Sequence, residues 1–169
     1  MQLPYDAAME HLWAPWRNTY VKHPQERKGN IFAEIARGSD DEANFVLARA
    51  KSCFALLNLY PYNTAHLMVV PYRATGVLED LSEAELMELM SMLMRMKAAV
   101  TAAFNPQGFN VGINLGAAGG AGIEEHLHIH LVPRWRGDAN FMTSIGQTRI
   151  IPELLVDTYT KLKTGFSAL

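Results

Sequence analysis

The feature that most constrains the fold of this chain is a row of three histidines at alternate positions, each followed by an aliphatic residue. They are His126, His128 and His130. Successive side chains of a β-strand point to opposite faces, so a strand here places all three imidazoles on one face. Histidine ionises near neutral pH, so the row offers a neutral nucleophile beside proton donors. The pattern therefore predicts a strand that carries the chemistry of the chain.

Three interpretations of this strand remain open. The histidines lie on a solvated face, they bind a metal ion, or they perform covalent catalysis at phosphorus. In a strand the outer two are about 13 Å apart, so only two of them share one ion readily. The single cysteine, Cys53, excludes a Cys-x-x-Cys pair. Covalent catalysis uses all three histidines and is the interpretation that we favour.

Length and charge narrow the class of protein further. A chain of 169 residues is most simply one domain with a real core. The net charge of −2 provides no basic field for nucleic acid. No basic and apolar leader begins the chain, and no apolar run approaches the ~20 residues of a membrane span. We therefore expect a cytoplasmic protein without a nucleic-acid or membrane partner.

The pattern of apolar runs and turn signals predicts an α+β domain, in which one long helix covers an antiparallel sheet. Ser82 and Glu85 form a capping box before the long helix, which runs to about Phe104. Five methionines of this helix are predicted to pack in the core: Met87, Met90, Met92, Met94 and Met96. The other predicted elements are strands at 44–50, 53–60, 66–71, 109–115 and 126–132, a short helix at 30–38 and a closing helix at 152–163 that begins with Pro152.

Four glycines lie among the seven residues 116–122, directly before the histidine row. Glycine lets several backbone amides point at one anion and lets a ligand approach closely. The segment matches neither the Walker phosphate loop nor the dinucleotide fingerprint, so alone it indicates a flexible connection. Its position beside three histidines instead favours a phosphate-binding loop.

The motif His-φ-His-φ-His-φ-φ, where φ is hydrophobic, resembles the signature of the histidine triad (HIT) superfamily of nucleotide hydrolases and transferases. Residues 126–132 match it fully, and the resemblance extends from about Ile31 to Arg134. It implies a single HIT domain over 1–169, with extensions at 1–29 and 135–169. It also implies that two copies dimerise into one continuous sheet. Both extensions look like those of a bacterial branch related to diadenosine tetraphosphate phosphorylases.

The resemblance also assigns roles to residues of this chain. His128 falls on the nucleophile that attacks the α-phosphorus, His130 on the group that helps the leaving group, and His126 on the one that orients the nucleophile. His66 falls on a fourth family histidine, and Asn58 on the ribose contact. The remaining implied nucleotide contacts are Phe32, Ile35, Leu56, Asn114, Gly120, Gly122 and Ile123, although plain core packing explains the apolar ones equally well.

Two departures from the family pattern bear on the chemistry. Many bacterial members carry zinc-binding cysteines beside the Ile-Phe pair, where this chain has Asn30 and Ala33, so we expect no structural zinc. Another branch has a glutamine before the triad that contacts phosphate, where this chain has Gly122 and Ile123. That contact is therefore replaced by backbone amides or lost. We expect no tightly bound cofactor, and at most a divalent cation that accompanies the substrate.

The expected activity is cleavage of a dinucleoside polyphosphate, diadenosine tetraphosphate or triphosphate, through a nucleotidyl-histidine intermediate. Related transferases and phosphorylases replace the third histidine by glutamine, so retention of His130 leans towards hydrolysis without excluding phosphorolysis. The alternatives are a nucleoside phosphoramidate or adenylyl-sulfate hydrolase, a nucleotide-binding regulator with little activity, and a metal-binding protein.

Overall fold

The computed structural model describes residues 29–138 and 153–166, and it confirms the predicted α+β class and the order of the strands. Most of the two predicted extensions, including Pro152, lies outside the described residues. The elements are α2 (Ile31–Arg37), β1 (Val46–Arg49), β2 (Cys53–Leu57), β3 (Leu67–Pro71), η1 (Leu78–Asp80), α3 (Glu83–Phe104), β4 (Gly108–Ile113), η2 (Ala117–Gly119), β5 (Ile129–Arg134) and α5 (Leu155–Phe166).

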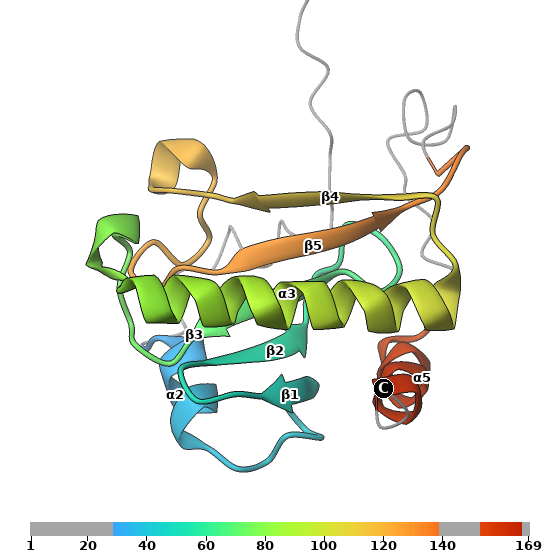
Figure 1. Cartoon of the computed structure of the whole chain (residues 1–169), viewed down its shortest axis with the longest axis horizontal. Coiled ribbons are helices and arrows are strands. Elements are labelled where there is room, and N and C mark those ends of the chain that lie inside the picture. Colours follow the sequence, from blue (N-terminus) through green and yellow to red (C-terminus); the bar gives the residue numbers. More distant parts are fainter. Residues whose placement is uncertain (1–28, 139–152, 167–169) are drawn as a thin grey trace, which may run out of the picture.

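The strands form one antiparallel sheet in the order β1-β2-β3-β5-β4. Helix α3 connects β3 to the edge strand β4, and β5 then pairs between those two strands (Figure 1). In this register Met68 of β3 lies opposite His130 of β5. The topology therefore brings residues from the first half of the chain beside the histidine row.

Both faces of the central strands are buried, which explains their nearly continuous apolar sequences. On β2, Ala55 and Leu57 belong to the core under α3, while Phe54 and Leu56 pack with α2 on the opposite face. Helix α5 lies against α3 and β1, where the Tyr159 hydroxyl donates to the Val46 carbonyl at 3.1 Å. In the ranges 29–138 and 153–166, no helix is long and apolar enough to cross a membrane.

Helix α3 begins with the predicted capping box, in which the Ser82 side chain and the Glu85 side chain each bond the other residue's backbone. The prediction for its methionines was only partly right. Met92 and Met96 are buried, but Met87, Met90 and Met94 are 71%, 48% and 63% exposed. The 22-residue helix rests on the sheet through one face, so the methionines on its outer face point away from the core.

The strand that carries the triad begins later than the sequence predicts. β5 starts at Ile129, so only His130 lies on it, and His126 and His128 lie in the segment that leads into it. The Leu127 backbone nitrogen donates to the Thr75 carbonyl in the loop after β3, at 2.8 Å, instead of to a neighbouring strand. The alternation nevertheless holds, because Leu127 and Ile129 pack in the core under α3.

Candidate active site

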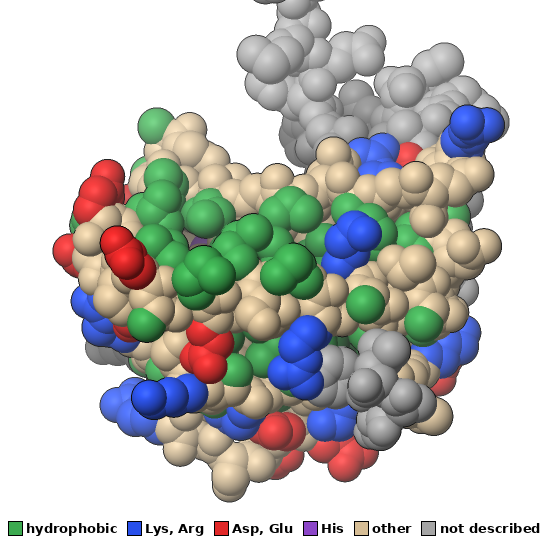
Figure 2. Space-filling model, in the orientation of Figure 1, with side chains coloured by type: hydrophobic (Ala, Val, Ile, Leu, Met, Phe, Trp, Pro, Cys, Tyr) green, Lys and Arg blue, Asp and Glu red, His purple; other side chains and the backbone are tan. Residues whose placement is uncertain are grey.

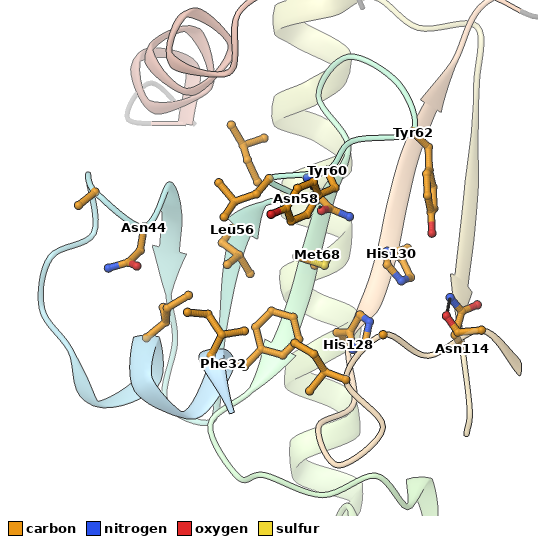
Figure 3. A pocket seen from close by; sticks show the side chains of 18 residues that line it. Phe32, Asn44, Leu56, Asn58, Tyr60, Tyr62, Met68, Asn114, His128 and His130 are labelled. Atoms are coloured by element: carbon orange, nitrogen blue, oxygen red, sulfur yellow. Dashed lines mark hydrogen bonds between the residues drawn. The ribbon is translucent and has the colours of Figure 1, made fainter. Parts of the chain in front are cut away.

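A pocket opens on the face of the sheet opposite α3, between α2 and the glycine segment (Figure 3). Its walls come from α2, from the end of β2 and the loop after it, from β3, and from the histidine segment. Ten of the predicted site residues line it: His128, His130, Asn58, Phe32, Ile35, Leu56, Asn114, Gly120, Gly122 and Ile123. The other two, His66 and His126, are completely buried and do not line it.

The backbone of His126 holds His128 as a nucleophile. Its Nδ1 atom lies 2.9 Å from the His126 carbonyl oxygen, which can only accept a hydrogen bond. The proton of neutral His128 is therefore on Nδ1, and the lone pair is on Nε2. Burial lowers the pKa of His128, which favours this neutral form. The ring thus has the tautomer and the charge that attack on phosphorus requires.

His130 and His66 form a chain of hydrogen bonds behind the pocket. The backbone nitrogen of Tyr62 donates to Nδ1 of His66 at 3.0 Å, which places the proton of neutral His66 on Nε2. That Nε2 atom lies 3.0 Å from Nδ1 of His130 and donates to it. Neutral His130 consequently carries its own proton on Nε2. His130 is thereby arranged as a donor towards an anion in the pocket, which suits assistance to a leaving group.

His126 stands behind the nucleophile rather than beside the ligand. Its Nε2 atom donates to the Pro71 carbonyl at 2.7 Å, and its Nδ1 atom lies 3.0 Å from the Asn30 side-chain oxygen. Burial lowers the pKa of His126 too, against the opposing effect of the Pro71 hydrogen bond. This placement fits the predicted orienting role of His126.

The apolar part of the pocket is built by α2 and the sheet. Phe32 and Ile35 are buried on one face of α2 and pack against Leu56 and Met68. The Phe32 ring centroid lies 5.1 Å from that of His128. An apolar slot that ends beside a nucleophile can hold a nucleobase with its phosphate at the imidazole.

Polar residues complete the lining. Asn58 accepts from the Tyr60 backbone nitrogen at 2.9 Å, so its oxygen also stabilises a turn. Sequence reasoning missed Asn44, which lines the far end of the pocket, and Tyr62, whose ring stacks on His66 with centroids 4.7 Å apart (Figure 3). No periodicity or motif marks either residue, and only the folded chain brings them here.

The glycine segment is shaped as a turn beside the histidines. Gly116 and Gly120 have φ values of 68° and 84°, which residues with a side chain adopt at a cost. Asn114 holds the turn, because its side-chain nitrogen donates to the Gly120 carbonyl at 3.3 Å. The ends of this turn, Gly122 and Ile123, line the pocket.

No cluster of three or more His, Cys, Asp or Glu side chains suited to a metal ion occurs within 29–138 and 153–166. The only cysteine is buried in the core, where burial raises the pKa of its thiol to about 11. The titratable side chains that line the pocket are His128, His130, Tyr60 and Tyr62.

Known proteins resemble this chain in sequence and in fold. Residues 40–137 match the HIT domain family. A Mycobacterium tuberculosis protein named AP-4-A phosphorylase is 47% identical over 167 residues, covering 94% of this chain and 85% of that protein. A Schizosaccharomyces pombe protein named bis(5'-nucleosyl)-tetraphosphatase [asymmetrical] is 32% identical over 93 residues, 55% of this chain and 50% of that protein.

Among solved structures, a Hit-like protein from Bartonella henselae has a TM-score of 0.65 at 24% identity, covering 82% of this chain and 98% of that one. A zinc-bound histidine triad family protein from Mycobacterium smegmatis has a TM-score of 0.66 at 23% identity, with coverages of 82% and 93%. These likenesses confirm the fold predicted for one chain.

Proposed function

Since this chain belongs to the HIT domain family, we propose that it cleaves diadenosine tetraphosphate through a nucleotidyl intermediate on His128. The observation that carries the proposal is the tautomer of His128, which keeps the lone pair of a neutral, buried imidazole on Nε2 beside the apolar slot of the pocket. The likeness to the M. tuberculosis phosphorylase supports the substrate, because it extends beyond residues 40–137 into both ends of the chain.

The reaction has two displacements at the same phosphorus. In the first, Nε2 of His128 bonds to an α-phosphorus, the bond to the bridging oxygen breaks, and ATP leaves. His130 offers a proton to the departing phosphate, and amides of the glycine turn face the charge on the remaining oxygens. In the second, an acceptor attacks the nucleotidyl-histidine and restores the free imidazole.

We propose inorganic phosphate as this acceptor. Retention of His130 favours water, but a relative that matches 94% of this chain is named a phosphorylase, which favours phosphate. Gly122 lines the pocket without adding a side chain to it, which suits a second phosphate entering there. Phosphate would bond to the nucleotidyl phosphorus, displace His128 and release ADP.

Product analysis with labelled phosphate tests the proposal. Diadenosine tetraphosphate should yield ADP and ATP, with the label in ADP, at a rate that rises with phosphate concentration. AMP and ATP formed independently of phosphate would show hydrolysis and refute the choice of acceptor. No cleavage under either condition would refute the proposed activity, and would point to a nucleotide-binding regulator.

We further propose that the protein acts as a homodimer joined through β4 and the exposed side of α3. β4 is an edge strand of the sheet. Hydrophobic side chains gather along α3 and towards β4 (Figure 2). The large exposed apolar side chains in these two regions are Leu86, Met87, Met90 and Met94 on α3, Val111 on β4, and Leu115 just after β4. A second copy that covers them would extend the sheet across the interface.

Replacing Met94 with glutamate should therefore shift the protein from dimer to monomer, because a carboxylate would be buried in the interface. Light scattering after size exclusion measures the mass directly. Val156 on α5 provides the control, because it is 59% exposed and Met94 is 63% exposed. Val156→Glu should leave the mass unchanged. An unchanged dimer in Met94→Glu, or a wild-type monomer, would refute this interface.

A cytoplasmic location, the absence of a tightly bound cofactor and the lack of nucleic-acid and membrane partners stay predictions. A divalent cation would enter only with the polyphosphate, whose charge it would offset.

A further inference from the structure

A part-buried contact joins the start of α2 to the first histidine of the triad. The Asn30 side-chain oxygen lies 3.0 Å from Nδ1 of His126, although the two residues are separated by 96 positions. The same oxygen lies 3.0 Å from the backbone nitrogen of Ala33 and caps α2. One amide group therefore contacts both the helix that lines the pocket and a histidine behind the nucleophile.

His126 connects Asn30 to the nucleophile His128, because it contacts both residues. Its ring is completely buried, its Nε2 atom is held by the Pro71 carbonyl, and the Phe32 ring meets it edge to face at 5.5 Å. Its own carbonyl accepts the Nδ1 proton of His128. A shift of the His126 ring would move that carbonyl and turn Nε2 of His128 away from its line of attack.

The amide of asparagine suits either protonation state of His126. When the ring is doubly protonated, both nitrogens donate, and the Asn30 oxygen accepts from Nδ1. Burial favours the neutral ring, in which Nε2 keeps its proton for Pro71 and Nδ1 carries a lone pair. Rotation of the amide by about 180° then presents its nitrogen as a donor to Nδ1, in exchange for the capping hydrogen bond from the Ala33 backbone nitrogen. An ionised aspartate can only accept a hydrogen bond, and the shorter serine side chain does not reach His126.

We propose that Asn30 is a positioning residue, which holds the His126 ring and thereby fixes the direction of the His128 nucleophile. The kinetic consequence rests on the proposed function, whereas the contact itself exists without substrate. The groups that face His126 are Pro71 at the end of β3, Asn30 and Phe32 at α2, and Glu125 and His128 on its own segment.

The first variant separates positioning from capping. Serine caps helices about as well as asparagine, but its shorter side chain does not reach His126. For Asn30→Ser we expect kcat for diadenosine tetraphosphate to fall about 10-fold or more, because small misalignments of a nucleophile are costly. We expect KM to change less than about twofold, because the apolar pocket is intact. Asn30→Ala, which also loses the cap, should add a lower melting temperature.

The second variant, Asn30→Asp, keeps the size of the side chain but removes its hydrogen-bond donor. Aspartate caps helices but offers only acceptors, and its negative charge stabilises a protonated His126. In Asn30→Asp the ring nitrogens of His126, followed by NMR in the protein without substrate, should titrate at higher pH than in the wild type. The kcat–pH profile should move in the same direction.

These readouts distinguish the possible failures. Wild-type kcat in both Asn30→Ser and Asn30→Asp, or an unchanged NMR titration of His126 in Asn30→Asp, would show that Asn30 only caps α2 and would overturn the proposal. If the wild-type protein cleaves no diadenosine tetraphosphate, the proposed function fails. The NMR comparison would still decide whether Asn30 controls His126.

Discussion

Turnover of diadenosine tetraphosphate is expected to disappear when His128 is replaced with asparagine, with a loss of at least about 10³-fold in kcat. An amide lacks a basic lone pair and cannot form the phosphorus–nitrogen bond of the intermediate. Nucleotide binding should stay within about tenfold, since it rests on the apolar slot around Phe32 and on the polar lining. Steady-state kinetics and calorimetric titration with a nucleotide product measure the two effects.

The wild-type enzyme provides a second check on the same residue. Rapid denaturation in alkali, in which the phosphorus–nitrogen bond of the intermediate is stable, should trap label from a labelled substrate on the protein, and His128→Asn should trap none. Burial lowers the pKa of His128. The pH at which kcat/KM has lost half of its value on the acid side should therefore lie below the ordinary histidine pKa of about 6.5. A variant that keeps half of the activity would disprove the nucleophile assignment.

Gly76 should be the most sensitive position outside the histidines. A Cβ atom at this glycine would lie within van der Waals overlap of the Glu124 backbone, and 3.4 Å from Cα of Glu125. Those two residues directly precede His126, and the neighbouring Thr75 carbonyl already binds the Leu127 backbone. Gly76→Ala must therefore displace the histidine segment. We expect kcat to fall about 10²-fold and the free energy of unfolding to fall by about 1–3 kcal/mol.

Gly165→Ala on α5 is the control, because a Cβ atom there has no heavy atom within 4 Å and α5 lies outside the proposed interface. It should retain wild-type kcat and at least wild-type stability in the same turnover and denaturation measurements, because alanine favours a helix over glycine. Wild-type behaviour of Gly76→Ala would mean that the histidine segment tolerates the displacement, and that the loop after β3 has no part in placing it.

Sequence predicted the parts of this molecule that depend on local chemistry. Alternation around Ile129 predicted which side chains face the core, and Ser82 with Glu85 predicted where α3 begins. The family resemblance predicted a set of nucleotide contacts, of which Phe32 and Asn114 are examples, and all of them line one pocket.

The remainder depends on contacts between distant segments. β5 begins at Ile129 because the Leu127 amide binds the loop after β3, and no pattern in 126–132 specifies that partner. The proximity of Asn30 to His126 likewise follows only from the packing of α2 on the sheet. The tautomer of His128 is set by a backbone carbonyl, which any residue at position 126 would supply.

The pairing of Leu131 with Leu67 and of His130 with Met68 ties catalysis to folding. A slip of β5 by one residue would turn His130 into the core under α3 and Leu131 towards the pocket, because side chains alternate. Such a misfolded sheet would bury a polar ring without a hydrogen-bond partner, and its free energy would be higher than that of the native sheet. The register that buries Leu131 in the core is thus also the register that turns His130 towards the pocket. Burial of the apolar side chains therefore stabilises the arrangement that the active site needs.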